Sequence, residues 1–422
     1  MLETKVNSNI TIKYIPMSKL KTTTMGVYIH RPLIENEVSQ NALLPYVLRR
    51  SCKKYPSTEA IAKELEALYG ATLSSAVTKF GEDHVLYFDA ESISEKYALS
   101  GEKLLSQLTR LLLNVIFEPD ADENGFDSTI FEQEKKNAKD RILASINDKR
   151  SYASIRCQQE MCLGDSFALS RLGTTEGMDS ITPKSLYAHY KKIISSSPID
   201  IYICGEADVD EIKNLVQEYV CGMEFAMPKL PQTKILQKNA SKKEVTEEMD
   251  VTQGKLSIGF RTNTAPTDAD YAALSVFNSV YGAGAHSKLF NNVREKLSLA
   301  YYASSQLEKY KGLLVVNAGI EFENFEKAYT ESLAQLEEIK KGNISDLEFT
   351  SSIQAITNSY QSFYDDQRYM QSFYLSEHIA GTNRNIDDVI KAIQSVTKED
   401  VKNIAHKLEL DTVYFLKGKG DK

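Results

Sequence analysis

The sequence predicts an α+β fold made of two homologous domains, each an antiparallel-rich sheet with helices packed on one face. Segments that alternate like half-buried strands are separated by pairs of amphipathic helices, which is typical of α+β proteins rather than of strict β-α alternation. The order of these segments repeats in the second half of the chain. A length of 422 residues allows two or three domains, and the repeat indicates two.

The first half contains a helix, a strand and a longer helix in that order. Ser57 can cap the first helix and Gly70 can end it. A strand is expected at residues 84–90. The long helix that follows is closed by Pro119. Its apolar face consists of Leu104, Leu105, Leu108, Leu111 and Leu112.

The second half repeats this order, again with caps at the expected positions. Ser287 can cap one helix and Gly342 can end another. The expected strands are 255–261, 299–305 and 312–318. The corresponding segments are 61–77 with 289–305, 85–90 with 313–318, and 198–205 with 410–418. We therefore interpret the chain as a duplicated domain.

The boundary between the two copies is expected near the middle of the chain. Residues 223–250 contain Pro228, Pro231 and a polar run, with little apolar periodicity, which is typical of a linker. The predicted organisation is therefore a first domain at 1–222 and a second domain at 251–422.

Composition excludes several classes of function. Lys and Arg total 50 against 58 Asp and Glu, a net charge of −8, so the chain has no electrostatic reason to bind nucleic acid or anionic membranes. The most apolar stretch, 108–117, is too short to span a bilayer, and no signal peptide is visible. Five irregularly spaced cysteines favour a reduced environment. We expect a cytoplasmic protein.

Histidine is scarce and scattered. The chain has six, and the closest two, His378 and His406, lie 28 residues apart. No helix can therefore carry two imidazoles one turn apart, which excludes the commonest layout of a zinc hydrolase.

One long motif nevertheless resembles a family of zinc enzymes. Residues 281–290 (YGAGAHSKLF), continuing through Val293-Arg294-Glu295-Lys296 to Leu299-Ala300-Tyr301, resemble the second domain of the pitrilysin/insulinase family of metallopeptidases, the inverted-motif zincins that include mitochondrial processing peptidase. Residues 41–71 resemble the first domain of that family. The resemblance covers essentially the whole chain and implies two halves that form a clamp.

The resemblance also locates what this chain lacks. The family's His-x-x-Glu-His helix, which holds zinc and its general base, should fall just before Lys53. By register, Leu44 and Leu48 stand in place of the histidines, Val47 in place of the glutamate, and Arg141 in place of the third ligand. Hydrophobic side chains cannot ligate zinc, and a guanidinium repels a dication. We expect no metal or other cofactor on this chain, and an ordinary apolar helix face instead.

The other half of the family's site is present. The resemblance implies that Arg294 and Tyr301, seven residues apart, bind the substrate backbone or polarise the scissile carbonyl, because both are good donors to an oxygen that gains charge. Alternatively, Arg294 serves the helix dipole and Tyr301 is a core aromatic residue. The family usually has glycine where this chain has Ser298.

Together these features predict a non-catalytic subunit of a heterodimeric zinc peptidase. Its partner would be a homologous chain that retains His-x-x-Glu-His and carries the zinc. This chain would close the peptide-binding cavity and offer Arg294 and Tyr301 to the substrate. One alternative is a non-enzymatic scaffold or peptide-binding protein of the same fold. Another is a lone metalloenzyme with relocated ligands, which would contain stoichiometric zinc.

Overall fold

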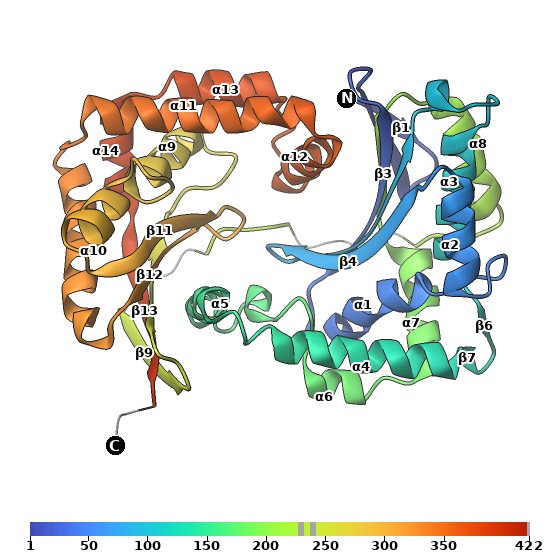
Figure 1. Ribbon diagram of the computed structural model, residues 1–422, viewed down its shortest axis with the longest axis horizontal. Helices are drawn as coiled ribbons and strands as arrows, with labels where there is room; N and C mark the ends of the chain where they lie inside the picture. Colours follow the sequence, from blue (N-terminus) through green and yellow to red (C-terminus); the bar gives the residue numbers. More distant parts are fainter. Residues whose placement is uncertain (227–231, 237–241, 420–422) are drawn as a thin grey trace. The chain divides into compact units, whose positions relative to one another are not determined.

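The computed structural model describes residues 1–226, 232–236 and 242–419, and the chain divides into two compact units (Figure 1). Unit 1 comprises Met1–Ala144, Leu169–Gln232 and Phe363–Leu375. Unit 2 comprises Ser145–Ala168, Thr233–Ser362 and Ser376–Lys422. Each unit is built on one sheet, and each includes one segment from the opposite half of the sequence.

Unit 1 contains a six-stranded sheet in the order β1-β2-β8-β3-β5-β4. Its strands are β1 (Leu2–Lys5), β2 (Ile10–Pro16), β3 (Thr22–Pro32), β4 (Thr72–Phe80), β5 (Asp83–Ile93) and β8 (Ile199–Gly205). Neighbouring strands are antiparallel except β2 and β8, which run parallel. The predicted strand at 84–90 lies within β5.

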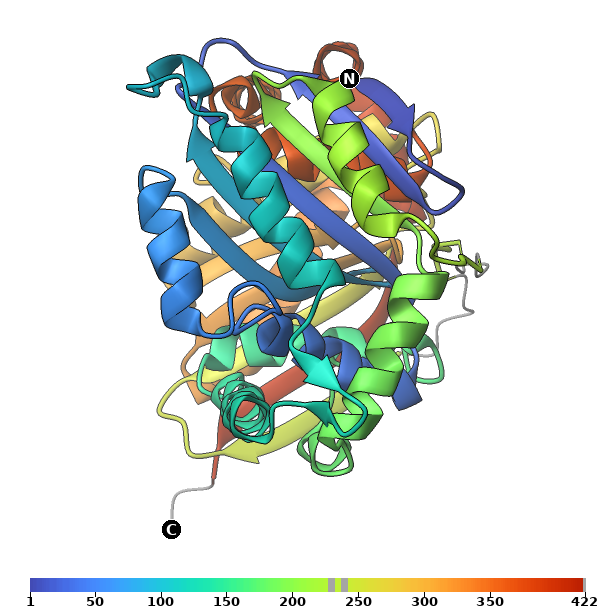
Figure 2. The same ribbon diagram turned by 90° about the vertical axis from the view of Figure 1, so that its right-hand side faces the viewer.

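Helices cover one face of this sheet, as the sequence predicts (Figure 2). The longer helices are α1 (Glu35–Leu48), α2 (Thr58–Ala67), α3 (Leu104–Phe117), α4 (Ser128–Ala144), α7 (Pro183–Ser196) and α8 (Val209–Val220). Short elements lie between them, namely η1 (Glu95–Tyr97), β6 (Ala121–Asp122), β7 (Gly125–Phe126) and α6 (Thr175–Asp179). The five leucines expected on one face of α3 are all buried in the core. Ser57 accepts a hydrogen bond from Ala60 N and caps α2.

Unit 2 repeats the topology of unit 1, with no equivalent of β1 among the residues that the structure describes. Its sheet has the order β11-β12-β10-β13-β9, which corresponds to β4-β5-β3-β8-β2. The strands are β9 (Lys243–Met249), β10 (Gly254–Arg261), β11 (Ala300–Glu308), β12 (Leu313–Ile320) and β13 (Glu409–Gly418). β13 and β9 run parallel and the other pairs antiparallel, so the parallel pair also recurs. The predicted duplication of an antiparallel-rich domain is confirmed.

The helices of unit 2 from the second half of the chain lie between its strands in the sequence, as those of unit 1 do apart from α8. They are α9 (Tyr271–Tyr281), the π-helix η3 (Leu289–Lys296), η4 (Phe322–Asn324), α10 (Phe325–Lys340), α11 (Asp346–Ser362), α13 (Ile386–Gln394) and α14 (Lys398–Lys407). None of the helices within the described residues combines the length and the apolar character needed to traverse a bilayer.

The second face of each sheet receives a helix from the opposite half of the sequence. In unit 2, α5 (Lys149–Met161) packs on β10 and β13. The Met161 sulfur occupies the space that a Cβ atom at Gly259 would need, so this close contact requires glycine. In unit 1, the start of α12 (Gln367–Ala380) packs on β3, where Gln371 Nε2 donates to Thr24 Oγ1 at 2.8 Å. The two compact units thus exchange these two segments relative to the expected ranges 1–222 and 251–422, and along the chain they meet between Gln232 and Thr233.

The expected linker at 223–250 is corrected at its end. Lys243–Met249 form the edge strand β9, whose residues alternate between partly buried and exposed. Alternation of this kind marks a strand with one solvated face. Residues 227–231 and 237–241 of the expected linker lie outside the described residues.

Candidate functional site

The α1 residues that stand in place of the family's two histidines and its general-base glutamate belong to the core of unit 1. Leu44, Val47 and Leu48 are only 1%, 3% and 2% exposed. They contribute to the apolar cluster beneath the sheet, so the predicted ordinary role as a helix face is confirmed. Their side chains have no donor atoms, and zinc requires nitrogen, sulfur or oxygen ligands. The residues at this position do not fit a metal ion.

Arg141 lies beside α1, although on a different side from the leucines. Its guanidinium carbon is 3.8 Å from the centroid of the Tyr46 ring, a cation–π contact. On an α-helix Tyr46 points about 160° away from Leu44 and from Leu48. The structure therefore brings Arg141 to α1, but not to the face on which the two leucines stand. Among the described residues, no group of three or more His, Cys, Asp or Glu side chains is placed to hold a metal ion.

Two buried histidines anchor the first half of α1. Asn41 Nδ2 donates to His84 Nδ1 at 3.2 Å, and His189 Nε2 donates to Asn41 Oδ1 at 2.8 Å. His84 Nε2 donates to the carbonyl of Arg171 at 3.0 Å. Burial lowers the pKa of both histidines to about 4, so both rings are neutral at pH 7. This network positions a helix and carries no chemistry of its own.

The second predicted site forms a pocket on unit 2. A cavity of about 400 Å³ is open to solvent beside the end of η3 and the start of β11. Its lining comprises Arg294, Glu295, Ser298, Tyr301, Glu321 and Asn324, with Leu299 and Ala300 between them. The structure thus brings Arg294 and Tyr301, the two residues that the family resemblance identifies, to one pocket. The roles of these two residues stay a prediction.

The backbone between Arg294 and Tyr301 explains how this pocket forms. Arg294 lies on a π-helix, in which Leu297 N donates to Asn292 O, five residues back, at 3.1 Å. Such helices are rare and occur frequently at functional sites. Ser298 then adopts a left-handed backbone with φ of 49° and turns the chain into β11. Glycine adopts this conformation at little cost, which accounts for the glycine that the family usually has here.

Each of the two side chains already has a partner in the pocket. The Arg294 guanidinium stacks on Phe290, with its carbon 4.6 Å from the ring centroid, and Nη1 is 3.3 Å from a Glu295 oxygen. Tyr301 is 60% exposed, which rules out a core role. Its hydroxyl donates to the Glu321 carboxylate, and this hydrogen bond raises the pKa of Tyr301. Arg294 also lies in the last turn of η3, so a contribution to the helix dipole is compatible with its position.

Glu321 is the pocket residue that sequence reasoning missed. It follows β12, and Tyr301 lies at an irregularity of the β11–β12 register, where Ala300 pairs with Ile320 and Tyr302 with Gly319. Only this long-range pairing places the two side chains together. A local sequence pattern around residue 321 carries no such signal.

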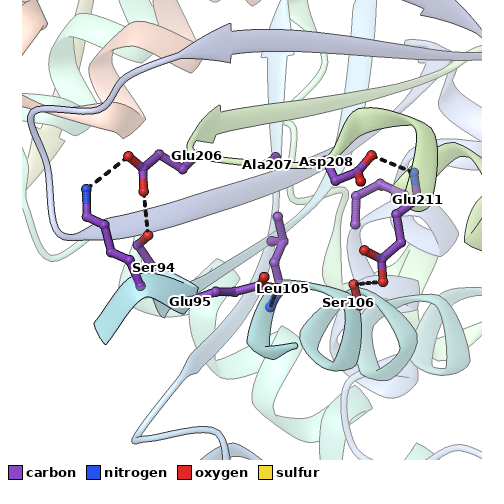
Figure 3. Close-up of a pocket in the computed structure, with 10 residues that line it drawn as sticks. Ser94, Glu95, Leu105, Ser106, Glu206, Ala207, Asp208 and Glu211 are labelled. Carbon is purple, nitrogen blue, oxygen red and sulfur yellow. Dashed lines mark hydrogen bonds and ion pairs between the residues drawn. The ribbon is translucent and has the colours of Figure 1, made fainter. Parts of the chain in front are cut away.

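A second cavity, on unit 1, is smaller, and the carboxylates that line it accept hydrogen bonds from neighbouring residues of the same cavity. It has a volume of about 180 Å³ and lies between α3 and the segment that leads into α8 (Figure 3). Glu206 accepts hydrogen bonds from Ser94 Oγ at 2.8 Å and from Lys96 Nζ at 2.9 Å. Glu211 accepts one from Ser106 Oγ at 2.6 Å. These carboxylates join neighbouring segments of the chain, so we assign this cavity no ligand.

Comparisons with known proteins agree with this geometry. A family model described as "Peptidase M16 inactive domain" matches residues 180–356. Over 412 residues the chain is 37% identical to the "Probable inactive metalloprotease YmfF" of Bacillus subtilis, covering 98% of this chain and 96% of that protein.

Solved structures match along the whole chain. A conserved protein from Enterococcus faecalis V583 is 27% identical, with a TM-score of 0.92 over 100% of this chain and 99% of that one. A protease from Helicobacter pylori has a TM-score of 0.83 over 98% of both chains. At 14% identity, this second likeness concerns the fold alone.

Proposed function

The chain belongs to the M16 family of peptidases, the pitrilysin/insulinase family that its sequence resembles, and on this premise we propose that it is the non-catalytic subunit of a heterodimeric zinc peptidase. Its partner would be a homologous chain that retains His-x-x-Glu-His. This chain would close the peptide-binding cavity and offer Arg294 and Tyr301 to a peptide held at the partner's zinc.

An asymmetric loss carries the proposal. The α1 positions that correspond to the family's two histidine ligands and its general base hold two leucines and a valine in the core of unit 1. Arg294 and Tyr301, by contrast, line one open pocket on unit 2, with 40% of the Arg294 side chain and 60% of Tyr301 exposed. Relaxed selection would erode both sites alike. Retention of only the second supports a role that needs the Arg–Tyr pair without a metal on the same chain.

The chemistry expected of this pair is electrostatic. Zinc on the partner would supply a Lewis acid for the scissile carbonyl. From this chain, the planar guanidinium of Arg294 and the phenol of Tyr301 can donate hydrogen bonds to a carbonyl oxygen that gains negative charge. A cytoplasmic location, favoured by the five irregularly spaced cysteines, forms part of the same proposal. Partners that are peptides rather than nucleic acids or anionic membranes also belong to it, and the charge of −8 favours them.

A second candidate is a peptide-binding protein or scaffold with no part in cleavage. It is favoured by the hydrogen bond of Tyr301 to Glu321 and the ion pair of Arg294 with Glu295. In the isolated chain both side chains are therefore occupied. Such a pocket can hold a peptide without stabilising a transition state.

Co-expression with the homologous zinc-bearing chain tests the proposal. Arg294→Ala combined with Tyr301→Phe should lower kcat for peptide cleavage by about 10²- to 10³-fold, the usual effect of removing oxyanion donors. The pair should still assemble, as checked by size-exclusion chromatography. The matched control is Arg110→Ala with Tyr97→Phe on unit 1, whose side chains are similarly exposed. Unchanged cleavage by the first variant would exclude a role in catalysis and leave the scaffold.

A further inference from the structure

The hydroxyl hydrogen of Tyr301 is already in use. It is donated to the Glu321 carboxylate across the β11–β12 pair. A phenol has one hydrogen to donate. While this bond exists, Tyr301 can accept hydrogen bonds from a peptide but cannot donate one to a peptide carbonyl. A ligand that uses Tyr301 as a donor must therefore first weaken the hold of Glu321.

The charges around the pocket indicate which ligand can do so. The pocket contains one guanidinium, that of Arg294, and two carboxylates, those of Glu295 and Glu321. Arg294 pairs with Glu295 at 3.3 Å. In the described part of the chain, Glu321 has no lysine or arginine within ion-pair distance, and its hydrogen-bond partner is the neutral Tyr301. One negative charge at the pocket is left without a cation.

We propose that Glu321 selects peptides that carry an ammonium or guanidinium group beside the carbonyl held by Arg294, and that this cation releases Tyr301. The inference rests on the proposed function of the Arg294–Tyr301 pocket. A cation at the other Glu321 oxygen partly compensates the charge of the carboxylate, which weakens the charge-assisted hydrogen bond that Tyr301 donates to it. The phenol can then turn toward the adjacent carbonyl. Glu321 is thus a specificity-determining residue that also positions Tyr301.

The cation could belong to a lysine or arginine side chain or to the free amino terminus of a peptide. The two sources share one chemistry, and blocking the terminus distinguishes them. A purely structural role for Glu321, in which the bond to Tyr301 only secures two strands, makes a different prediction. Glutamine preserves the shape of this side chain and can still accept the phenol hydrogen, but it has no charge.

The test uses the purified full chain and fluorescence anisotropy. The probes are Gly/Ala nonapeptides with a dye at the C-terminus and either lysine or norleucine at the centre, each with a free or an acetylated amino terminus. The wild-type chain should bind the acetylated lysine peptide about fivefold more tightly than the norleucine peptide at low salt, which is the upper range for an exposed ion pair. Salt should reduce this preference. If the amino terminus is the recognised cation, the lysine and norleucine peptides should bind alike, and acetylation should weaken the binding of both about fivefold.

The variant Glu321→Gln should bind all the peptides equally, with its affinity for the norleucine peptide unchanged. Glu295→Gln is the matched control and should keep the preference, because Arg294 already balances its charge. A preference for lysine or for a free amino terminus that survives in Glu321→Gln, or a wild type that shows neither preference, would overturn this inference alone, provided that the acetylated norleucine peptide still binds in an Arg294-dependent way. If Arg294→Ala binds every peptide as well as the wild type, or nothing binds, both this inference and the pocket's proposed role are wrong.

Discussion

The two units share one strand order, yet the residues that could do chemistry are buried in one and exposed in the other. In unit 1, the α1 positions that correspond to two metal ligands and the general base are filled by Leu44, Leu48 and Val47, which contribute to the core. In unit 2, Arg294 and Tyr301 remain at an open pocket. The two units therefore share a strand order, but the local surroundings of a side chain determine whether it packs in the core or is available to a ligand.

The second faces of the two sheets differ in charge as well. In unit 1, the Lys13 ammonium donates to Tyr202 Oη at 3.3 Å, on strands β2 and β8. In unit 2, on the corresponding strands β9 and β13, the Tyr414 hydroxyl donates to Glu247 at 2.6 Å. A tyrosine at one position thus faces a cation in one copy and an anion in the other. Duplication leaves the electrostatics of each face free to diverge.

Unit 1 also buries a charged cluster on that face. His30 Nδ1 is 2.6 Å from Asp83 and its Nε2 is 3.6 Å from Asp200, which also pairs with Lys13 at 2.7 Å. Two cations then balance two carboxylates, provided that His30 is protonated. Burial by itself would lower the pKa of His30, but the carboxylates of Asp83 and Asp200 outweigh it and raise the pKa to about 10.

The largest expected effect sharpens the contrast between core and pocket. Leu44→Ala should lower the free energy of unfolding by about 2–5 kcal/mol, because it leaves a cavity in a fully buried site. Tyr301→Phe removes one exposed hydroxyl and should change it by less than about 0.5 kcal/mol. Urea denaturation followed by circular dichroism measures both. Leu143→Ala, at an exposed leucine of α4, is the size-matched control. A Leu44→Ala variant as stable as this control would contradict the assignment of Leu44 to the core.

The second prediction concerns pH and belongs to unit 1. The pKa of His30 is raised above its unfolded value of 6.5 to about 10. The stabilisation that protonated His30 gives the fold through Asp83 and Asp200 is therefore complete below pH 6.5 and is lost as pH rises through 10. The free energy of unfolding should fall by about 1 kcal/mol per pH unit in this window. Denaturant melts at several pH values measure the slope. His30→Gln should abolish it, while exposed His406→Gln should keep it; equal slopes in all three proteins would contradict a charged His30.

The smallest expected effect concerns the turn that forms the pocket of unit 2. Ser298→Gly should raise the free energy of unfolding by about 0.5–1 kcal/mol, because glycine adopts the left-handed backbone without the strain of a side chain. Differential scanning calorimetry would show a higher Tm. Ser298→Ala retains the Cβ atom and should give no such gain. If the Tm of the Ser298→Gly variant is equal to or lower than that of the wild type, the left-handed backbone at Ser298 is not strained.

Much of the fold could be read from the sequence because its signals are local. The leucine stripe of α3, the Ser57 cap and the paired segments of the two halves all appear as spacing along the chain. The Arg294–Tyr301 pair was accessible only through the resemblance of residues 281–301 to the family's motif. That Ser298 forms a left-handed turn became clear only from its backbone angle.

What the sequence by itself determined is the duplicated α+β plan, the absence of zinc-ligand chemistry from Leu44, Val47 and Leu48, and the retention of Arg294 and Tyr301. Tertiary structure alone decided that α5 and the start of α12 each pack on the opposite half's sheet. It also decided that Glu321 holds the Tyr301 hydroxyl. The physical reason is that periodicity identifies an apolar face, whereas the partner of a polar side chain depends on strand register and on contacts between residues far apart in the chain.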